Sequence, residues 1–375
     1  MKLVLLWSDV LFFLLIAATL VGGVWASRQP HLRAGWRKVG QSRVAMGSAA
    51  VLAVFFAIAF VDSLHYRPQL PDTAQGEVRY SSEVFSALDA LLMPLRTQTE
   101  KTYSAPLATH LFAKETLDDA GRDFPPLRYP GTHLFGTDKV GQDVLYLTLK
   151  SIRTALLIGT LTTLIMLPAA IGLGLLAGYA GGWIDDVIQY LYTTLNSIPG
   201  VLLIAASVLM MQVVIDTHPE WFATSAERAD ARLLALCAIL GITSWTGLCR
   251  LLRGETLKLR ELEYVQAARA LGISSVSILW RHILPNVMHI VMIAMVMDFS
   301  GLVLAEAVLS YVGIGVDPNT ISFGTMINTA RMELAREPMV WWSLAAAFIF
   351  MFVLVLAANL FADALRDAFD PRTSR

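Results

Sequence analysis

The sequence predicts an all-α polytopic membrane protein, and three observations lead to that prediction. Of its 375 residues, 55% are hydrophobic and only 16% are charged, whereas a water-soluble domain carries about 25% charged residues. The hydrophobic residues gather in long runs, and Lys and Arg gather in some of the segments between those runs. In lipid, such runs satisfy their backbone hydrogen bonds by forming helices.

Seven segments are long and apolar enough to cross a bilayer, for which about 20 residues are needed. They cover roughly residues 3–25, 45–62, 151–180, 187–215, 231–252, 286–311 and 339–362. Cys237 and Cys249 fall in the fifth segment, about 18 Å apart along one helix, which is too far for a disulfide. Because no Cys/His cluster and no His pair has a metal-ligand spacing, we expect no metal site.

The positions of Lys and Arg predict the orientation of these spans. Residues 26–44 contain five basic side chains and no acid, and residues 253–285 and the tail 363–375 are also rich in Arg. With seven crossings, all three regions lie on the cytoplasmic side. The N-terminus and residues 63–150 then lie outside, and the chain divides into two N-terminal spans (1–62), an outer loop or small cap (63–150), a five-helix core (151–362) and a tail.

The first span has a competing interpretation as a secretory signal peptide. Its apolar run is long for a signal peptide, and Asp9 interrupts it. Cleavage would also leave the basic residues 28–43 outside, against the charge rule. A retained span is the favoured interpretation.

The outer region contains a long connection, residues 63–132, with seven prolines and few apolar residues. Connections of this length are usually functional or disordered. The sequence leaves open whether this one forms a small cap or a poorly ordered loop, and it contains no catalytic constellation.

Glycines at four-residue spacing, Gly174, Gly178 and Gly182, lie in the third span and just after it. Small residues at this spacing let helices approach closely in lipid. Pro168 removes one backbone hydrogen bond and predicts a kink. Two interpretations stay open: tight packing alone, or a moving helix that lines a pathway.

Three polar residues in or near the spans are candidates for a pathway or gate: Asn196, Asp298 and Glu306. Acids inside a membrane are costly and usually face a cavity. Asp298 and Glu306 are eight residues apart and therefore lie near one helical face. Glu306 lies close to the outer end of its span, so a packing role is as open as substrate contact, and the same holds for Asn196.

The sequence also excludes several functions. No GxxxxGK[ST] motif is present, so the chain has no P-loop for nucleotide phosphates. No GxSxG motif indicates a serine hydrolase. We therefore expect a non-catalytic chain that binds neither a cofactor nor nucleic acid.

The segment 263–286 is polar although it lies between two apolar spans. Tyr264, Ala267, Ala268 and Leu271 recur at helical spacing and predict one side of a short helix. Gly272 predicts its C-terminal stop, and Ser274 or Ser275 predicts the cap of a second piece that lies along the membrane interface up to Pro285. Physical reasoning leaves two interpretations equal: an element that transmits force to both spans, or an amphipathic connector on the membrane surface.

This segment resembles the EAA loop of ABC importer permeases. Ala267, Ala268, Gly272, Leu284 and Pro285 stand in register with that pattern, while Gln266 replaces its Glu and His282 its Ile. The form EYVQAARALG followed by RHILPN is typical of the oligopeptide/dipeptide/nickel permease family. Segments 135–144 (with Gln142 where Arg is usual), 177–185, 197–200, 304–315 and 365–372 resemble the C-type subunit of that family in the same order.

The resemblance implies a six-span permease core, to which this chain adds one N-terminal span and a long outer loop. It implies a multi-pass subunit of the bacterial cytoplasmic membrane that forms half of the pathway of an ATP-driven importer, with peptides as the expected substrates. Its implied partners are a second permease subunit of the B type, two ATPase subunits that bind ATP and Mg²⁺, and an extracytoplasmic binding protein. Within the cytoplasmic loop 253–285, the implied ATPase-coupling residues are Glu263, Tyr264, Gln266, Ala267, Ala268, Leu271, Gly272, Leu284 and Pro285.

The alternative function is that of a secondary transporter of a small solute. Such a carrier predicts ionisable or cation sites in broken helices of two repeated halves. Asp298 and Glu306 give it little support, and no inverted repeat is visible.

Overall fold

The computed structural model describes residues 2–28, 30–69, 80–81, 83–117, 121–222, 224–317 and 319–369. Within these residues, seven helical segments are long and apolar enough to cross a membrane, which confirms the predicted number of spans. They are α1 (Trp7–Arg28), α3 (Arg43–Asp62), α6 (Val144–Ala180), α8 (Gly200–Thr217), α9 and α10 (Ser225–Ser244 and Thr246–Leu259), α12 to α13 (Ser275–Ile278 and Leu284–Val312) and α15 (Trp342–Phe369).

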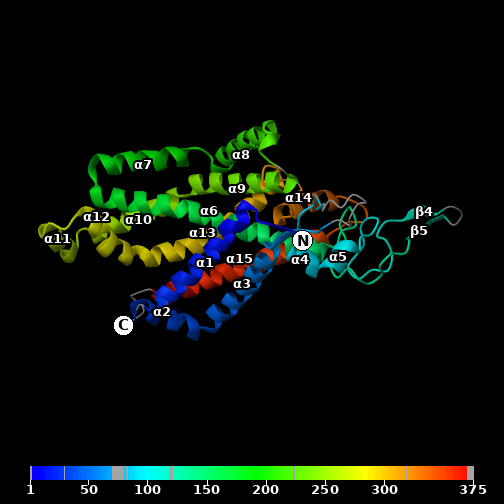
Figure 1. The fold of residues 1–375 in the computed structure, drawn as a ribbon, viewed down its shortest axis with the longest axis horizontal. Helices are drawn as coiled ribbons and strands as arrows, with labels where there is room; N and C mark the ends of the chain where they lie inside the picture. Colours follow the sequence, from blue (N-terminus) through cyan, green and yellow to red (C-terminus); the bar gives the residue numbers. More distant parts are fainter. Residues whose placement is uncertain are drawn as a thin grey trace.

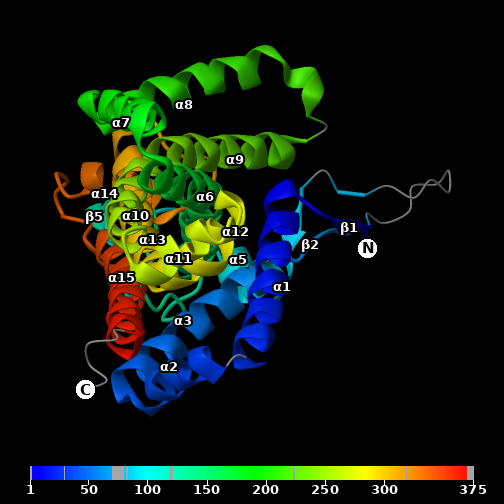
Figure 2. The same ribbon diagram turned by 90° about the vertical axis from the view of Figure 1, so that its left-hand side faces the viewer.

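The shorter elements lie at the two ends of this bundle (Figure 1). One end carries α2 (Pro30–Gln41), α11 (Glu263–Ala270) and the end of α15. The other end carries α4 (Ala87–Leu91), α5 (Met93–Thr97), α14 (Phe323–Glu333) and the hairpin of β4 (Glu115–Leu117) and β5 (Gly121–Asp123). Helix α7 (Gly182–Ser197) and α8 run along the side of the bundle opposite α2 and α3 (Figure 2).

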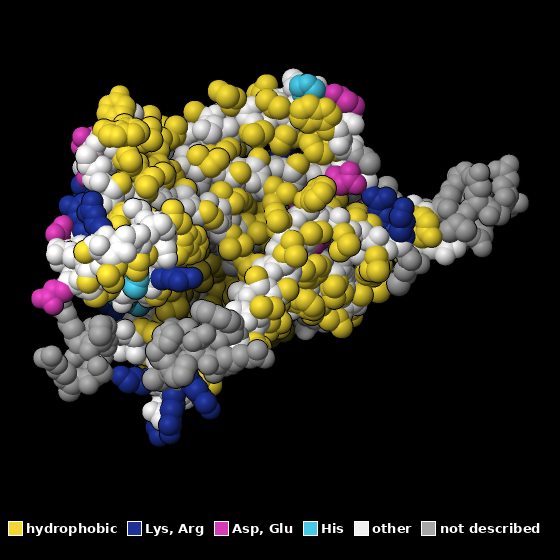
Figure 3. All heavy atoms as spheres, turned by 60° about the vertical axis from the view of Figure 1, so that its left-hand side comes forward, with side chains coloured by type: hydrophobic (Ala, Val, Ile, Leu, Met, Phe, Trp, Pro, Cys, Tyr) yellow, Lys and Arg dark blue, Asp and Glu magenta, His cyan; other side chains and the backbone are white. Residues whose placement is uncertain are grey.

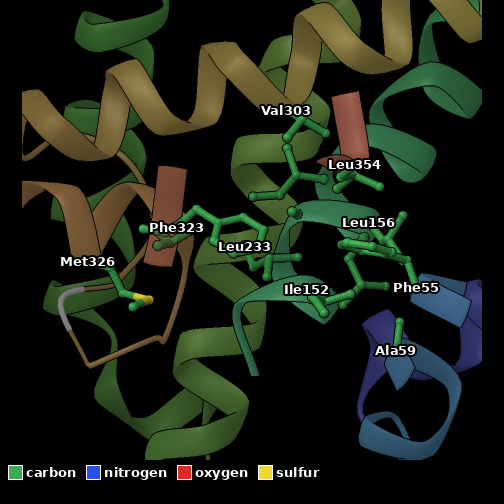
Figure 4. Packing of buried hydrophobic residues seen from close by; sticks show 14 of the residues in the cluster. Phe55, Ala59, Ile152, Leu156, Leu233, Val303, Phe323, Met326 and Leu354 are labelled. Atoms are coloured by element: carbon green, nitrogen blue, oxygen red, sulfur yellow. The ribbon is translucent and has the colours of Figure 1, made fainter. Parts of the chain in front are cut away.

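Helix α6 forms the centre of the bundle and packs against α3, α9, α10 and α13. Its outer half contains fully buried apolar residues such as Ile152 and Leu156. Figure 4 shows these two side chains meeting Phe55 from α3, Leu233 from α9 and Leu354 from α15. The first two spans therefore share this core, through Phe12 of α1 and Phe55 of α3.

Contacts of the two ends of the chain show which regions lie at the same end of the bundle. Strand β1 (Lys2–Val4) pairs antiparallel with β2 (His65–Arg67), which in turn pairs with β3 (Phe85–Ser86). At the opposite end, the rings of Trp36 on α2 and Phe369 on α15 meet with centroids 5.9 Å apart. The N-terminus thus lies with the 63–150 region, and the basic 30–41 segment lies with the end of α15, as the charge distribution predicts.

Ion pairs near the outer end join α1 to the other spans. Asp9 accepts from Arg153 on α6 at 2.5 Å, and its other oxygen lies 2.7 Å from His65 Nδ1. The backbone N–H of Ser8 donates to Asp230 on α9 at 3.2 Å. Asp9, which interrupts the first apolar run, therefore anchors α1 to α6.

The described parts of the 63–132 region form a small folded cap. Glu100 is buried and accepts hydrogen bonds from the backbone of Arg128 and Tyr129 at 2.9 and 2.7 Å. Asp89 on α4 accepts from Tyr146 on α6 at 2.7 Å and lies 3.1 Å from Lys150. Burial raises the pKa of Asp89, but Lys150 and these hydrogen bonds outweigh it and leave the pKa below its usual value. Residues 70–79, 82 and 118–120 of this region lie outside the described residues.

Several predicted boundaries were wrong, each for a local reason. Helix α6 begins at Val144 rather than at 151, because Asp143 caps it by accepting from the Tyr146 N–H at 3.1 Å. The fourth predicted span is interrupted between α7 and α8, at Ile198 and Pro199, since Pro disfavours a helical conformation in the residue before it. By contrast, α6 continues through Pro168.

Candidate functional site

The polar segment between the fifth and sixth spans folds into the short helix α11 at the end of the bundle that carries α2 (Figure 1). Glu263 lies in its first turn and Arg269 in its last, which complements the helix dipole at both ends. Gly272 follows with φ of +77°. Its N–H donates to Arg269 O, and the N–H of Ile273 donates to Ala268 O at 3.1 Å. This is a Schellman motif, and it confirms Gly272 as the predicted stop.

The second piece differs from its prediction. Ser274 caps α12, as expected, by accepting from the Ser277 N–H at 3.4 Å. The chain then passes through a π-helical turn, η2 (Leu279–Ile283), directly into α13. A separate interfacial helix was therefore the wrong prediction, because the π turn accommodates Pro285 at the second position of α13 without ending the helix. Leu284 is half-buried beside the apolar cluster of this region, and Pro285 is exposed.

The two faces of α11 have different surroundings. Val265 and Ala268 are only 2% and 5% exposed and pack in a cluster with Ile278 and Ile283. Leu271 is 81% exposed. Tyr264 and Ala267 are also exposed, as are Glu263 and Gln266. The sequence placed Ala268 on the same side as Tyr264, Ala267 and Leu271, but the structure turns Ala268 toward the interior of its own chain.

Tyr264 links α11 to the start of the sixth span. Its hydroxyl accepts from Asn286 Nδ2 at 3.2 Å, and its ring lies 6.2 Å from that of His282. Gln266 donates from its amide to the backbone oxygen of Glu261 at 3.1 Å. These contacts hold α11 against both of its neighbouring spans.

Helix α10, which leads into α11, is packed tightly against α6. A Cβ added at Gly178 would lie 2.6 Å from Thr256 Cβ and 2.7 Å from Arg253 O, and one at Gly174 would lie 2.9 Å from Cys249 O. The predicted close approach of helices at these glycines is therefore confirmed for Gly174 and Gly178. Gly182 has nothing within 4 Å.

Charged side chains reinforce this contact. Arg253 on α10 donates to both carboxylate oxygens of Asp185 at the start of α7, at 2.5 and 2.7 Å. Arg260 donates to the backbone oxygen of Gly178 at 3.1 Å. The hydrogen bond from Arg253 holds the pKa of Asp185 below its usual value. Sequence reasoning missed these residues, although Asp185 and Arg253 both lie at the inner ends of predicted spans.

The three pathway candidates lie in different environments and do not form one site. Asn196 is exposed and accepts from Thr246 at 3.0 Å, which links the end of α7 to α10. Glu306 is fully buried and accepts from Ser310 and Ser322 at 2.7 and 2.9 Å, so it joins α13 to the start of α14. Asp298 is half-buried and has no hydrogen-bond partner among the described residues. A role of Asp298 in a pathway stays a prediction.

Comparison with known proteins gives consistent similarities. A family model described as "Binding-protein-dependent transport system inner membrane component" matches residues 170–375. The oligopeptide transport system permease protein OppC of Mycobacterium tuberculosis is 35% identical over 246 residues, which cover 65% of this chain and 78% of OppC.

Two further relatives have comparable coverage. The glutathione transport system permease protein GsiD of Pectobacterium atrosepticum is 34% identical over 64% of this chain and 73% of its own length. The dipeptide permease protein DppC of Bacillus subtilis is 28% identical over 72% of this chain and 76% of its own length. Among solved structures, an inward-facing MetNI methionine ABC transporter aligns over 60% of this chain and 97% of that chain, with a TM-score of 0.43 and 15% identity.

Proposed function

Because this chain belongs to the family of binding-protein-dependent transport system inner membrane components, we propose that it forms half of the pathway of an ATP-driven peptide importer and is coupled to ATPase subunits through α11. Among its relatives are permease proteins named for oligopeptide, dipeptide and glutathione transport. Peptides are the substrate class that these names share. The chain has no P-loop, so ATP and Mg²⁺ would bind to the partner ATPases.

The observation that carries the coupling proposal is the two-sided character of α11. One face is buried in the chain's own apolar cluster, while Leu271 and Tyr264 on the other face are exposed at the cytoplasmic end, together with Leu262. Exposed apolar side chains that cluster on a surface indicate an interaction site. An ATPase subunit is the partner expected at this end of the molecule.

The connections of α11 allow its movement to reach two spans at once. It follows the end of α10 at Leu259 after a short turn, and it precedes α12 by a connection capped at Ser274. Because α10 is packed against α6 and paired with α7, a displacement of α11 would move these helices as a unit rather than bend the loop. Transitions of this kind proceed by shifts of packed helices.

The remaining partners of the proposal are a second permease subunit of the B type and an extracytoplasmic binding protein. Helices α7 and α8 carry large exposed apolar residues along their length, including Trp183, Tyr190, Leu202 and Met210. Lipid or the second permease would cover this face. The small cap at the other end lies where a binding protein would deliver substrate.

The test uses a charge on the exposed face of α11. Ala268→Asp is unsuited, because Ala268 is buried in its own chain and a charge there would damage the fold. Leu271→Glu places a charge on a side chain that is 81% exposed, so the chain should fold and insert normally. If Leu271 docks on an ATPase, recovery of the ATPases with the affinity-purified chain should fall on the order of tenfold or more.

The matched control is Leu91→Glu on α4, at the opposite end of the bundle, where Leu91 is 70% exposed. It should leave ATPase recovery unchanged at equal chain abundance. Normal ATPase recovery and normal peptide uptake with Leu271→Glu would refute the coupling role of this face.

A further inference from the structure

A cavity of about 660 Å³ lies between α1 and the rest of the bundle. Its wall is formed by five of the membrane-crossing helices, α1, α3, α6, α13 and α15. Leu20 and Leu164, which line it, are also exposed on the surface of the bundle, so the cavity opens sideways at the depth of the membrane. Its volume lies within the range of about 300–1,000 Å³ that is typical of sites for small molecules.

The lining of this cavity offers no free hydrogen-bond donor to an occupant. Among the described residues, its polar side chains are Thr19, Thr160 and Thr163. Each donates to a backbone oxygen of its own helix, at 2.8, 2.6 and 2.7 Å. A peptide in this cavity would leave its backbone oxygens without hydrogen-bond donors, and water would find few polar partners. A hydrocarbon chain has no hydrogen bonds to lose when it enters the cavity.

The cytoplasmic end of the cavity lies beside a basic helix. Val296 and Phe361 line the cavity and also pack on the small cluster of Val39, Ala45 and Leu365, which holds α2 against α15. Phe361 and Leu365 are one helical turn apart, about 6 Å. The corner formed by α2 and the start of α3 therefore lies next to the end of the cavity that Val296 and Phe361 line.

This corner carries three exposed cations, Arg37, Lys38 and Arg43. None of the three takes part in an ion pair among the described residues, and residues 26–44 contain no acid. In Figure 3, hydrophobic side chains cover the middle of the visible face, and most of its Lys and Arg side chains lie toward the left-hand end and the bottom. Basic sites between helices at the cytoplasmic surface bind the headgroups of anionic lipids.

We propose that the cavity beside α1 binds an anionic phospholipid of the inner leaflet. An acyl chain fills the apolar space between α1, α3 and α6, and the phosphate lies on Arg37, Lys38 and Arg43. The lipid thus adds to the contact between the added N-terminal span and the core, which the ion pair of Asp9 with Arg153 and the hydrogen bond of Ser8 with Asp230 make near the outer end. This inference depends on the geometry of the chain alone and is independent of its transport substrate.

The test measures lipid retention by the purified full-length chain. The chain is purified in detergent with equal amounts of phosphatidylglycerol and phosphatidylcholine that have the same acyl chains, and the bound lipid is identified by native mass spectrometry. Wild type should retain phosphatidylglycerol in preference to phosphatidylcholine. Replacing Arg37, Lys38 and Arg43 together by Gln should weaken phosphatidylglycerol binding roughly 100-fold and abolish the preference. Replacing Lys114, Arg128 and Lys139 at the outer end by Gln, an equal loss of charge, should leave the preference intact.

A second pair of variants tests the cavity itself. Ala53→Phe combined with Ala57→Phe puts two rings into the space from the α3 wall and should abolish retention of both lipids. Val54→Phe, on the same helix but outside the lining, should behave as wild type. Equal retention of the two lipids by wild type, or undiminished phosphatidylglycerol in the Ala53→Phe/Ala57→Phe variant, would overturn the proposal.

Discussion

Arg253 on α10 and Asp185 on α7 form a two-bonded ion pair, with Nε and a terminal nitrogen of Arg253 at 2.5 and 2.7 Å from the two oxygens of Asp185. Both side chains are largely buried, at 21% and 13% exposure. The fork of the guanidinium fixes the relative orientation of the two helices as well as their distance. This pair lies at the inner end of the bundle, close to the helix that we propose couples the chain to an ATPase.

We expect Arg253→Gln to lower the free energy of unfolding by about 1.5–3 kcal/mol, because it leaves Asp185 without its charged partner. Peptide uptake should fall as well, since α10 would no longer move as a unit with α7. Thermal unfolding of the purified chain and uptake at equal abundance measure the two effects. Lys258→Gln is the control: Lys258 pairs with Glu255 at 2.9 Å but is 75% exposed, and such surface pairs contribute little.

The same pair has a defined pH dependence. The pKa of Asp185 is lowered in the folded state, so the stabilisation is present above the unfolded-state pKa of about 3.9 and is lost as the pH falls through the lowered value. At neutral pH the pair should therefore be fully formed. A difference between wild type and Asp185→Asn that vanished between neutral and mildly acidic pH would contradict this assignment.

The close contact of α6 with α10 gives a second prediction. Gly178→Ala would bring a methyl group to 2.6 Å from Thr256 Cβ and 2.7 Å from a backbone oxygen, and overpacking of this kind costs about 1–3 kcal/mol. Gly172→Ala on the same helix meets nothing within 4 Å and should be neutral or slightly stabilising, because Ala favours a helix over Gly. Thermal unfolding of the two variants makes the comparison, and equal melting temperatures would show that α6 and α10 are not in contact as described.

Much of the fold could be predicted from local patterns. The number of spans follows from seven apolar runs, and the predicted orientation of the bundle in the membrane follows from the charges of the loops. Gly272 and Ser274 were identified because chain reversal and capping depend on a few neighbouring residues. The close packing at Gly174 and Gly178 was recognisable because small residues at that spacing let two membrane helices approach each other closely.

Features that depend on distant parts of the chain were not predictable in this way. The sequence does not reveal that Asp9 meets Arg153, or that Glu306 meets Ser322, because each pair forms only when separate helices pack. Ala268 faces the interior because α11 folds back on Ile278 and Ile283. The start of the sixth span was predicted wrongly at Pro285. The local rule that helices end near Pro does not hold here, because the π turn η2 allows the helix to continue.

The topology predicts which positions an impermeant thiol reagent reaches on intact cells. In a variant without Cys237 and Cys249, a cysteine at Thr132 should be labelled, because this exposed residue lies in the outer region. A cysteine at Gln41, which ends α2 and is also exposed, should be protected until the cells are opened. Ser8 is fully buried, so a cysteine there should resist labelling although it lies near the outer surface. Labelling of position 41 in intact cells would contradict the seven-span arrangement.

The last prediction concerns the turn after α11. Gly272 has φ of +77° and nothing within 4 Å of an added Cβ, so substitution there changes the backbone without creating a clash. Gly272→Val should strain this turn by about 1–3 kcal/mol and displace the Schellman motif that directs the chain from α11 into α12. We expect peptide uptake to fall, while insertion and abundance stay near wild type because the turn lies outside the membrane-crossing helices.

Gly272→Asn separates this effect from a general loss of function. Asn adopts the left-handed conformation more readily than other residues with a side chain, so it should restore most of the uptake and of the ATPase recovery that Gly272→Val loses. A connector that merely rests on the membrane surface would tolerate both substitutions equally. Uptake per copy of the chain, measured together with ATPase recovery for wild type and both variants, distinguishes the two cases. Near-normal uptake with Gly272→Val would mean that the shape of this turn does not carry force from an ATPase to α10 and α13.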